Sequence, residues 1–446
     1  MKELVTDSLT LLIDIKLQLV KNNIFLHSAQ LSLKNIVKNQ AQKRKSAKAQ
    51  KESRMSKPIA ILSAARTPIG GMLGSLSSLS APDLGALAIA AAIERSGADP
   101  SKIDEVLMGS VLTAGQGQAP ARQAALAAGL AQSTSCTTIN KVCGSAMKSV
   151  MVAGNTLRSG QAGMVVAGGM ESMSRAPYLI PEGRQGYRFG HAQMLDHMQY
   201  DGLQDAYQGV AMGQFAESCA AKYQFSREMQ DAFAIESLRR ANSAIDQGFF
   251  KAEIVPVTIS SRRGEVIVDT DQQPGNAKPD KIPQLKPAFQ KDGTVTAANA
   301  SSISDGAAAL TLMMADESQE RGLQPIALIH GYDESSQAPE WFTTAPVTAI
   351  NNTLKRVGWT VDQVDLWEIN EAFAVVAMAA MQELGIPHKK LNIHGGACAL
   401  GHPIGASGAR ILVTLIHALQ LTGGKKGIAS LCIGGGEATA MAIELI

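Results

Sequence analysis

Two stretches of this chain repeat one pattern, and the repeat limits the folds that the chain can adopt. Residues 87–109 and 350–370 each contain a helical segment, a Gly, a short turn and a buried strand that opens with an apolar residue and Asp. The two glycines, Gly97 and Gly358, are 261 residues apart. Strands that alternate with helices form βαβ units and a mostly parallel sheet. We therefore expect two similar α/β halves packed together; chance similarity between βαβ units is the alternative.

A second pair of segments supports the duplication. Residues 164–169 and 429–435 are both apolar runs of strand length that end in glycines. Their similarity predicts equivalent strands in the two halves.

The segment between the halves, about 175–300, differs in composition and holds most of the Tyr and Phe residues of the chain. Aromatic, loop-rich segments on a rigid scaffold commonly shape binding sites. We expect an inserted loop subdomain with this role, although a structural subdomain or an oligomer contact would have the same composition.

A chain of 446 residues is long for one hydrophobic core, which favours more than one domain. The predicted divisions are an N-terminal extension (1–54), a first domain (55–324) and a second domain (325–446). The net charge of +2 conceals an asymmetry, because residues 1–54 contain nine Lys and two Arg against four acidic residues. The remainder is mildly acidic, which argues against a nucleic-acid partner.

Residues 1–54 are Lys- and Gln-rich, and a new start follows at Met55. A solvated tail, or sequence upstream of the true start, is the favoured interpretation. A targeting segment is the alternative. A mitochondrial presequence would be rich in Arg and poor in acids, whereas this segment has two Arg and four acidic residues. We expect a cytoplasmic protein, or a mitochondrial one if the segment is a transit peptide.

The sequence predicts neither a membrane-spanning segment nor disulfide bonds. No run of 18 apolar residues occurs, and the best candidate, residues 9–20, is interrupted by Asp14 and Lys16. The five cysteines form no CxxC pair, so neither disulfides nor a zinc site are expected. We therefore expect the protein to work in a reducing compartment.

Cys143 follows a strand-like run, 137–142, and precedes a segment with helical apolar spacing, 144–157. A thiol at such a turn faces the helix N-terminus, whose dipole and free N–H groups lower a thiol pKa. We therefore expect a nucleophile. Taken alone, a cysteine is more often a buried apolar residue.

His402 lies among Gly and Ala residues without bulky packing partners, which favours a role as a base over one in packing. Cys398, four residues earlier, raises the alternative of a metal pair, but further ligands at a suitable spacing are missing, so no metal is predicted.

Cys432 ends an apolar strand and precedes three glycines, whose backbone N–H groups can point at a developing oxyanion. Asn370 ends the strand 366–369, where α/β folds gather their sites, and could hold a water or a substrate oxygen. Glu371 could be an acid in a helix first turn with a structural role only.

Together, five motifs in this order resemble the thiolase family, most closely its biosynthetic, acetoacetyl-CoA type, over about residues 56–446. The motifs are Asn140–Met147, Gly168–Ser174, Asn370–Ala374, Gly401–Pro403 with its flanking glycines, and Cys432–Gly436. The resemblance implies a five-layered α-β-α-β-α body and reversible condensation of two acetyl-CoA to acetoacetyl-CoA and CoA. It implies a homotetramer. It implies no cofactor or metal, because the coenzyme A thioesters are the substrates.

The resemblance also implies a role for each matching residue. Cys143 would accept the acetyl group, His402 would take its proton, and Cys432 would deprotonate the second acetyl-CoA. His402 and a water held by Asn370 would form one oxyanion hole. The backbone N–H groups of Cys143 and Gly434 would form the other.

The implied coenzyme A contacts are Ser301 beside the pantetheine, Arg262 near the nucleotide, and Phe289 and Phe373 lining the pocket. Tyr178 departs from the family pattern, because several relatives have His there, and the departure bears on acyl-chain preference.

Two alternatives within related chemistry remain, a broad-chain 3-ketoacyl-CoA thiolase of β-oxidation and a ketoacyl synthase. The latter shares the fold but lacks a second cysteine, so Cys432 argues against it. An alternative of another class, a non-catalytic acyl-CoA-binding protein, would require a degraded site, and none of these motifs is degraded.

Overall fold

The computed structural model describes residues 13–22, 57–262 and 264–446. The chain divides into two compact units, Met1–Ser56 and Lys57–Ile446. In the first unit, residues 13–22 form a helix whose residues are all exposed. The rest of the predicted extension, 1–12 and 23–54, lies outside the described residues.

The described part of the second unit contains a ten-stranded sheet with the order β12-β13-β14-β11-β1-β10-β5-β3-β4, and β2 pairs with β10. The strands of the N-terminal half are β1 (Ile59–Arg66), β2 (Gly70–Gly71), β3 (Glu105–Gly109), β4 (Ser135–Ile139), β5 (Met164–Ser172) and β10 (Ser304–Met314). Those of the C-terminal half are β11 (Ala327–Ser336), β12 (Leu366–Ile369), β13 (Lys426–Ile433) and β14 (Glu437–Leu445). The halves join where β1 pairs with β11.

The expected mostly parallel sheet is wrong, because the sheet is mixed. Only β3–β4, β3–β5 and β12–β13 are parallel among the described strand pairs. The physical reason is connection length. Parallel neighbours need a long crossover, whereas β13 and β14 are joined by residues 434–436 alone and must run antiparallel.

The expected duplication is confirmed. Helices α2 (Ala81–Ser96) and α9 (Ala345–Val357) both end at a left-handed glycine, with φ of 66° at Gly97 and 70° at Gly358. A 3₁₀ turn follows in each half (Pro100–Lys102 and Val361–Gln363), and then β3 or β12. A left-handed C-cap is a conformation that glycine adopts without steric cost, which is why the pattern is visible in the sequence.

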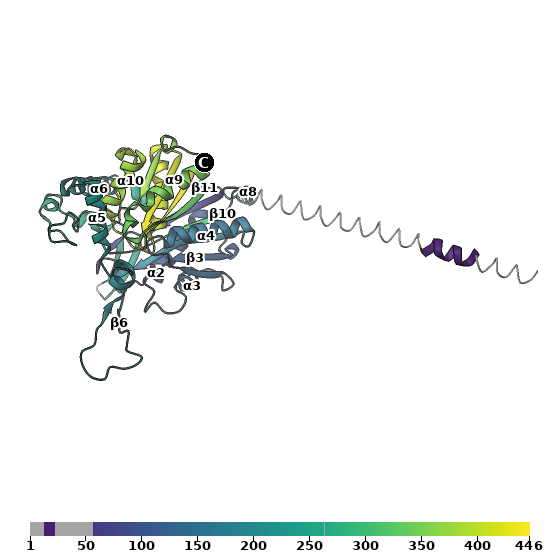
Figure 1. Cartoon of the computed structure of the whole chain (residues 1–446), viewed down its shortest axis with the longest axis horizontal. Coiled ribbons are helices and arrows are strands. Elements are labelled where there is room, and N and C mark those ends of the chain that lie inside the picture. The colour runs from purple at the N-terminus through teal and green to yellow at the C-terminus, as the bar shows by residue number, and fades with distance from the viewer. Residues whose placement is uncertain (1–12, 23–56, 263) are drawn as a thin grey trace, which may run out of the picture. The chain divides into compact units, whose positions relative to one another are not determined.

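The five-layered arrangement is also confirmed. Helices α4 (Ser145–Ser159) and α12 (Ser407–Thr422) share one apolar core with side chains from the sheet regions of both halves. Helices α2 and α3 (Pro120–Ala127) cover the outer face of the first half, and α9 and α10 (Ala374–Leu384) that of the second (Figure 1).

The central helices approach each other closely. A Cβ built on Gly408 of α12 would lie 2.4 Å from the backbone nitrogen of Met147 in α4, so only glycine fits there.

The insertion contains two long helices besides its loops, α5 (Met212–Tyr223) and α6 (Arg227–Asp246), and a short helix, α7 (Gln272–Asn276). It also contains two hairpins, β6 (Tyr178–Leu179) with β7 (Leu195–Asp196), and β8 (Val257–Ser261) with β9 (Gly264–Val268). The loop between β6 and β7 extends away from the layered body (Figure 1). The boundaries predicted for the insertion and for the two domains stay predictions.

A helix that crosses a bilayer needs about 20 mostly apolar residues, and none of the helices within residues 13–22, 57–262 and 264–446 meets this requirement.

Deleting residues 1–54 is expected to leave folding intact, because Lys57–Ile446 forms a compact unit with its own apolar cores. A chain beginning at Met55 should show the thermal unfolding midpoint and the specific activity of the full chain. An insoluble product, or a clearly lowered midpoint, would show that the extension contributes to the fold.

Candidate active site

Cys143 lies in the tight turn between β4 and α4. The turn is strained, because Val142 has φ of 45°, a value that a β-branched residue rarely adopts. It is held by Ser145, whose Oγ accepts from the backbone N–H of Lys141 at 2.8 Å and donates to the Val142 carbonyl at 2.6 Å. Cys143 packs against an apolar cluster that includes Ile404, two residues after His402. The turn therefore places the thiol at the start of α4, facing the loop of His402.

The expected lowering of the Cys143 pKa is wrong. Burial raises the pKa of this thiol to about 11, although the backbone N–H groups of Gly434 and of Cys143 itself donate to the sulfur. The desolvation of the thiolate outweighs these two hydrogen bonds. The resting group is therefore a protonated thiol, and its reaction requires a base.

Gly434 and Cys432 reach the first half from the end of β13. A Cβ on Gly144 would lie 2.3 Å from the Ile433 side chain, so the strand end and the start of α4 are in direct contact. Cys432 is fully buried, and burial, together with the neighbouring Cys143, raises its pKa well above the ordinary value. The structure thus brings the two thiols together from opposite halves of the duplication.

His402 is buried, and its tautomer follows from its partners. Its Nδ1 lies 2.5 Å from Ser407 Oγ, and this hydroxyl donates to the Pro403 carbonyl at 2.9 Å. Ser407 Oγ must therefore accept a hydrogen bond from Nδ1–H, which leaves Nε2 with the free lone pair. Burial lowers the pKa of His402 to about 3, so the imidazole is neutral and can act as a base.

Asn370 lies beside this lone pair. Its Nδ2 is 3.5 Å from His402 Nε2, and its Oδ1 accepts from Nη2 of Arg410 at 3.3 Å. Once Nε2 is protonated, Nε2 and Nδ2 are two N–H donors in the same place. Such a pair can stabilise a developing negative oxygen.

A buried carboxylate that the sequence did not mark as functional fixes the His402 loop. Glu171, at the end of β5, accepts from the backbone N–H of Gly405 at 2.9 Å, of Val111 at 3.0 Å and of Leu112 at 3.2 Å. Burial raises its pKa to about 7. The side chain joins the loop of the second half to the strand ends of the first.

The expectation for Glu371 requires correction, because α10 begins only at Ala374 and Glu371 is not in its first turn. The carboxylate is buried and accepts from Asn392 Nδ2 and Ser237 Oγ, both at 2.8 Å, and from the Cys398 backbone N–H at 3.1 Å. It therefore ties the segment after Asn370 to the segment before His402. No sequence signal identified these partners, since they are distant along the chain.

The alternative of a metal pair at Cys398 and His402 finds no support in this geometry. Cys398 Sγ donates to the Glu371 carbonyl at 3.6 Å, while both ring nitrogens of His402 face other partners. Within the described ranges, no group of three His, Cys, Asp or Glu is arranged to hold a metal ion.

Three of the four predicted coenzyme A contacts lie together. The Phe289 and Phe373 rings meet at 5.9 Å between centroids and are nearly perpendicular, and the Ser301 backbone N–H donates to the Ala372 carbonyl at 2.9 Å. Arg262 is exposed in the turn between β8 and β9. Tyr178, in β6, is also exposed.

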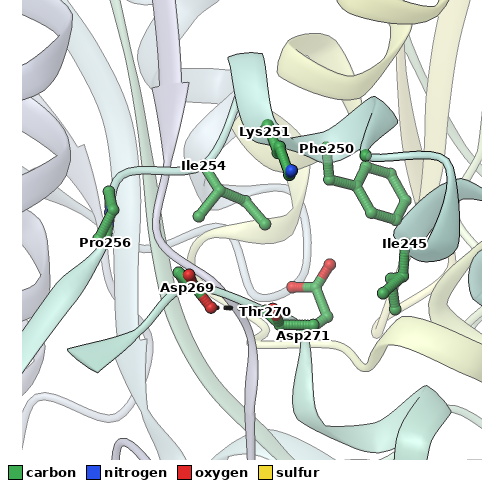
Figure 2. A pocket seen from close by; sticks show the side chains of 9 residues that line it. Ile245, Phe250, Lys251, Ile254, Pro256, Asp269, Thr270 and Asp271 are labelled. Carbon is green, nitrogen blue, oxygen red and sulfur yellow. Dashed lines mark hydrogen bonds between the residues drawn. The ribbon is translucent and has the colours of Figure 1, made fainter. Parts of the chain in front are cut away.

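A cavity of about 670 Å³ lies next to the residues predicted to react. Its lining includes Val142 and Gly434, the neighbours of the two thiols, together with Met212 and the segment 200–209. A smaller cavity of about 250 Å³ is lined by Phe250, Asp271 and other residues between 245 and 271 (Figure 2). None of the predicted site residues lines this second cavity.

Comparison with protein families gives two adjacent matches. Residues 59–316 match the family described as "Thiolase, N-terminal domain", and residues 323–445 match "Thiolase, C-terminal domain". Together they cover most of the second unit.

Individual relatives are similar over nearly their whole length. The chain is 51% identical to acetyl-CoA acetyltransferase 1 of Arabidopsis thaliana over 398 residues, 89% of this chain and 96% of that protein. It is 49% identical to acetyl-CoA acetyltransferase of Chromobacterium violaceum, covering 86% of this chain and 99% of that one.

Solved structures of two such enzymes have the same fold as this chain. The Acat5 thiolase from Ascaris suum, in complex with coenzyme A, is 45% identical with a TM-score of 0.83, covering 87% of this chain and 100% of that chain. The acetyl-CoA acetyltransferase of Bacillus anthracis is 40% identical with a TM-score of 0.86, covering 88% and 99%.

Alkylation of Cys143 by iodoacetamide is expected to accelerate about tenfold per pH unit between pH 7 and about pH 10, because the thiolate is the nucleophile and burial raises the pKa of this thiol to about 11. Mass spectrometry of the Cys143 peptide measures the rate, and the Cys143→Ser variant identifies labelling at other cysteines. A rate that is already maximal at pH 6 would instead indicate a preformed thiolate–imidazolium pair with His402.

Proposed function

Because this chain belongs to the thiolase family, we propose that it is an acetyl-CoA C-acetyltransferase that reversibly condenses two acetyl-CoA to acetoacetyl-CoA and CoA. One observation carries the proposal. Two thiols from opposite halves, Cys143 and Cys432, interact at a point where the backbone N–H groups of Cys143 and Gly434 converge. One thiol suffices for acyl transfer, whereas carbon–carbon bond formation also needs a group that moves the α-proton.

In the first half-reaction, His402 Nε2 takes the Cys143 proton as the sulfur attacks the acetyl carbonyl. The oxyanion accepts hydrogen bonds from the backbone N–H groups of Cys143 and Gly434. Collapse breaks the bond to CoA, and the departing thiolate takes the proton of Cys432. The products are acetyl-Cys143, free CoA, a protonated His402 and a Cys432 thiolate.

In the second half-reaction, the Cys432 thiolate removes the α-proton of another acetyl-CoA. The high pKa of this buried thiol makes its thiolate a strong base. Protonated His402 and Asn370, directly or through a water, stabilise the enolate oxygen. The carbanion then attacks acetyl-Cys143, and the released sulfur recovers its proton from His402. All three groups return to their resting protonation states.

The proposed acyl substrate rests on the relatives, which are described as acetyl-CoA acetyltransferases. Ser301 is proposed to lie beside the pantetheine, and Phe289 and Phe373 to line the pocket. Arg262 is proposed to contact the nucleotide of CoA. A profile of thiolysis rate against chain length tests the substrate assignment. Activity confined to acetoacetyl-CoA supports it, whereas comparable activity on C8 to C16 3-ketoacyl-CoAs would favour the broad-chain thiolase. Binding of acyl-CoA without turnover would favour the non-catalytic alternative.

We also propose a homotetramer in the cytoplasm. Support for assembly comes from the segment around the β6–β7 loop, which exposes large apolar side chains. These are Tyr178, Ile180, Tyr187, Phe189 and Met194. Exposed apolar patches of this kind commonly mark protein contacts.

Replacing each thiol should separate the half-reactions. Cys143→Ser is expected to abolish labelling by radioactive acetyl-CoA, because the nucleophile is lost. Cys432→Ser is expected to retain labelling of Cys143 but to condense about 100- to 10,000-fold more slowly, the usual value of positioned proton transfer. Persistent labelling of Cys143→Ser, or normal condensation by Cys432→Ser, would remove that residue from the proposed mechanism.

A further inference from the structure

Arg410 is a charged residue in an otherwise apolar part of α12, and only 1% of its surface is exposed. Its Nη1 donates to Glu368 Oε2 at 3.2 Å, and its Nη2 donates to Asn370 Oδ1 at 3.3 Å. Replacing a buried ion pair by apolar residues is often neutral or stabilising. Stability of the fold alone therefore does not account for this pair, and its contact with Asn370 suggests another role.

The contact with Arg410 determines how the Asn370 amide is oriented. The two ends of an Asn side chain have nearly the same shape, and hydrogen-bond partners decide which end lies where. A guanidinium has only donors, so Oδ1 must face Arg410 and Nδ2 must face His402 Nε2. A flipped amide would present an oxygen at this place, and an oxygen cannot donate to an enolate.

Two elements hold the guanidinium in place. Glu368 lies in β12, two residues before Asn370, and accepts from Nη1. Burial raises the pKa of Glu368 to about 8, although the positive charge of Arg410 lowers it. A carboxyl oxygen accepts a hydrogen bond from Nη1 in either protonation state. On α12, Arg410 lies three residues after Ser407, which holds His402 Nδ1. One face of one helix thus aligns both donors of the oxyanion site.

We propose that Arg410, anchored by Glu368, is a positioning residue for the condensation step, in which it fixes the Asn370 amide with Nδ2 toward His402. This inference rests on the proposed function. It predicts that Arg410 acts on the second half-reaction through Asn370. Burial is the larger cause of the lowered pKa of His402 and keeps this base neutral, and Arg410 lowers this pKa further, so acetylation of Cys143 should depend on Arg410 little.

A double-mutant cycle tests the inference. The full-length wild type, Arg410→Gln, Asn370→Ala and the double variant are compared in two assays, acetylation of Cys143 by radioactive acetyl-CoA and the kcat of condensation. Arg410→Gln should lower kcat about tenfold or more, but by no more than the loss of an oxyanion donor would. The same substitution should change the rate of acetylation less than about threefold. In the Asn370→Ala background, the same substitution should change kcat less than about threefold, since its target is absent.

A matched control is available at Arg66. This arginine is also fully buried, and it pairs with Glu253 at 2.5 Å and bidentately with Asp271 at 2.8 and 2.9 Å. Asp271 is one of the residues that line the second cavity (Figure 2). Glu253 in turn contacts α12 at Thr414. Arg66→Gln therefore removes buried ion pairs next to α12 without touching Asn370. Any effect it has on kcat should be the same with and without the Asn370 side chain.

The outcomes are distinct. If Arg410→Gln lowers kcat by the same factor in both backgrounds, or lowers acetylation and condensation equally, its role is structural and the inference is wrong. If Arg410→Gln does not fold, Arg410→Met combined with Glu368→Leu removes both buried charges together and enters the same cycle. A wild type that forms no acetyl-enzyme overturns the proposed function itself, whereas an active wild type with an additive cycle overturns only the role of Arg410.

Discussion

The close contact between the His402 loop of one half and the strand ends of the other is the constraint on which the site depends. A Cβ on Gly169 of β5 would lie 2.0 Å from the Gly405 carbonyl oxygen, and one on Gly109 of β3 would lie 2.7 Å from it. Glu171 adds a hydrogen bond to the Gly405 N–H. Without these contacts, His402 and Cys143, which come from different halves, would not share a site. The glycines are thus requirements of packing at this contact.

Burial then decides the chemistry of the reacting groups. Desolvation keeps both thiols protonated and the imidazole neutral, so the resting site holds no charge on Cys143, Cys432 or His402. In the proposed mechanism, charges arise only when protons move between these groups during the reaction. The permanent cation of Arg410 lies one step away, behind Asn370. In the proposed mechanism, such a site stabilises the enolate through fixed donors without first reorganising water.

Sequence motifs identified the residues that the structure brings together, but not their states. Cys143, His402, Cys432 and Asn370 could be named because each ends a recognisable strand or glycine-rich turn. The pKa of Cys143 was predicted in the wrong direction, since the helix N-terminus was visible in the sequence and the desolvation was not. The βαβ pattern predicts a mostly parallel sheet. It does not show that β1 and β14 pair antiparallel with their neighbours, because that pairing is set by the tertiary structure.

The sequence by itself determined the chemical groups, their division between two duplicated halves, and the turns that present them, because residue type and local spacing are properties of the chain. Tertiary structure alone decided the tautomer of His402, the protonation of the thiols and the orientation of the Asn370 amide. Each of these depends on burial and on partners such as Glu171, Ser407 and Arg410, whose contacts exist only when the two halves pack together. Hydrogen bonds and desolvation therefore turn a set of reactive side chains into an ordered site.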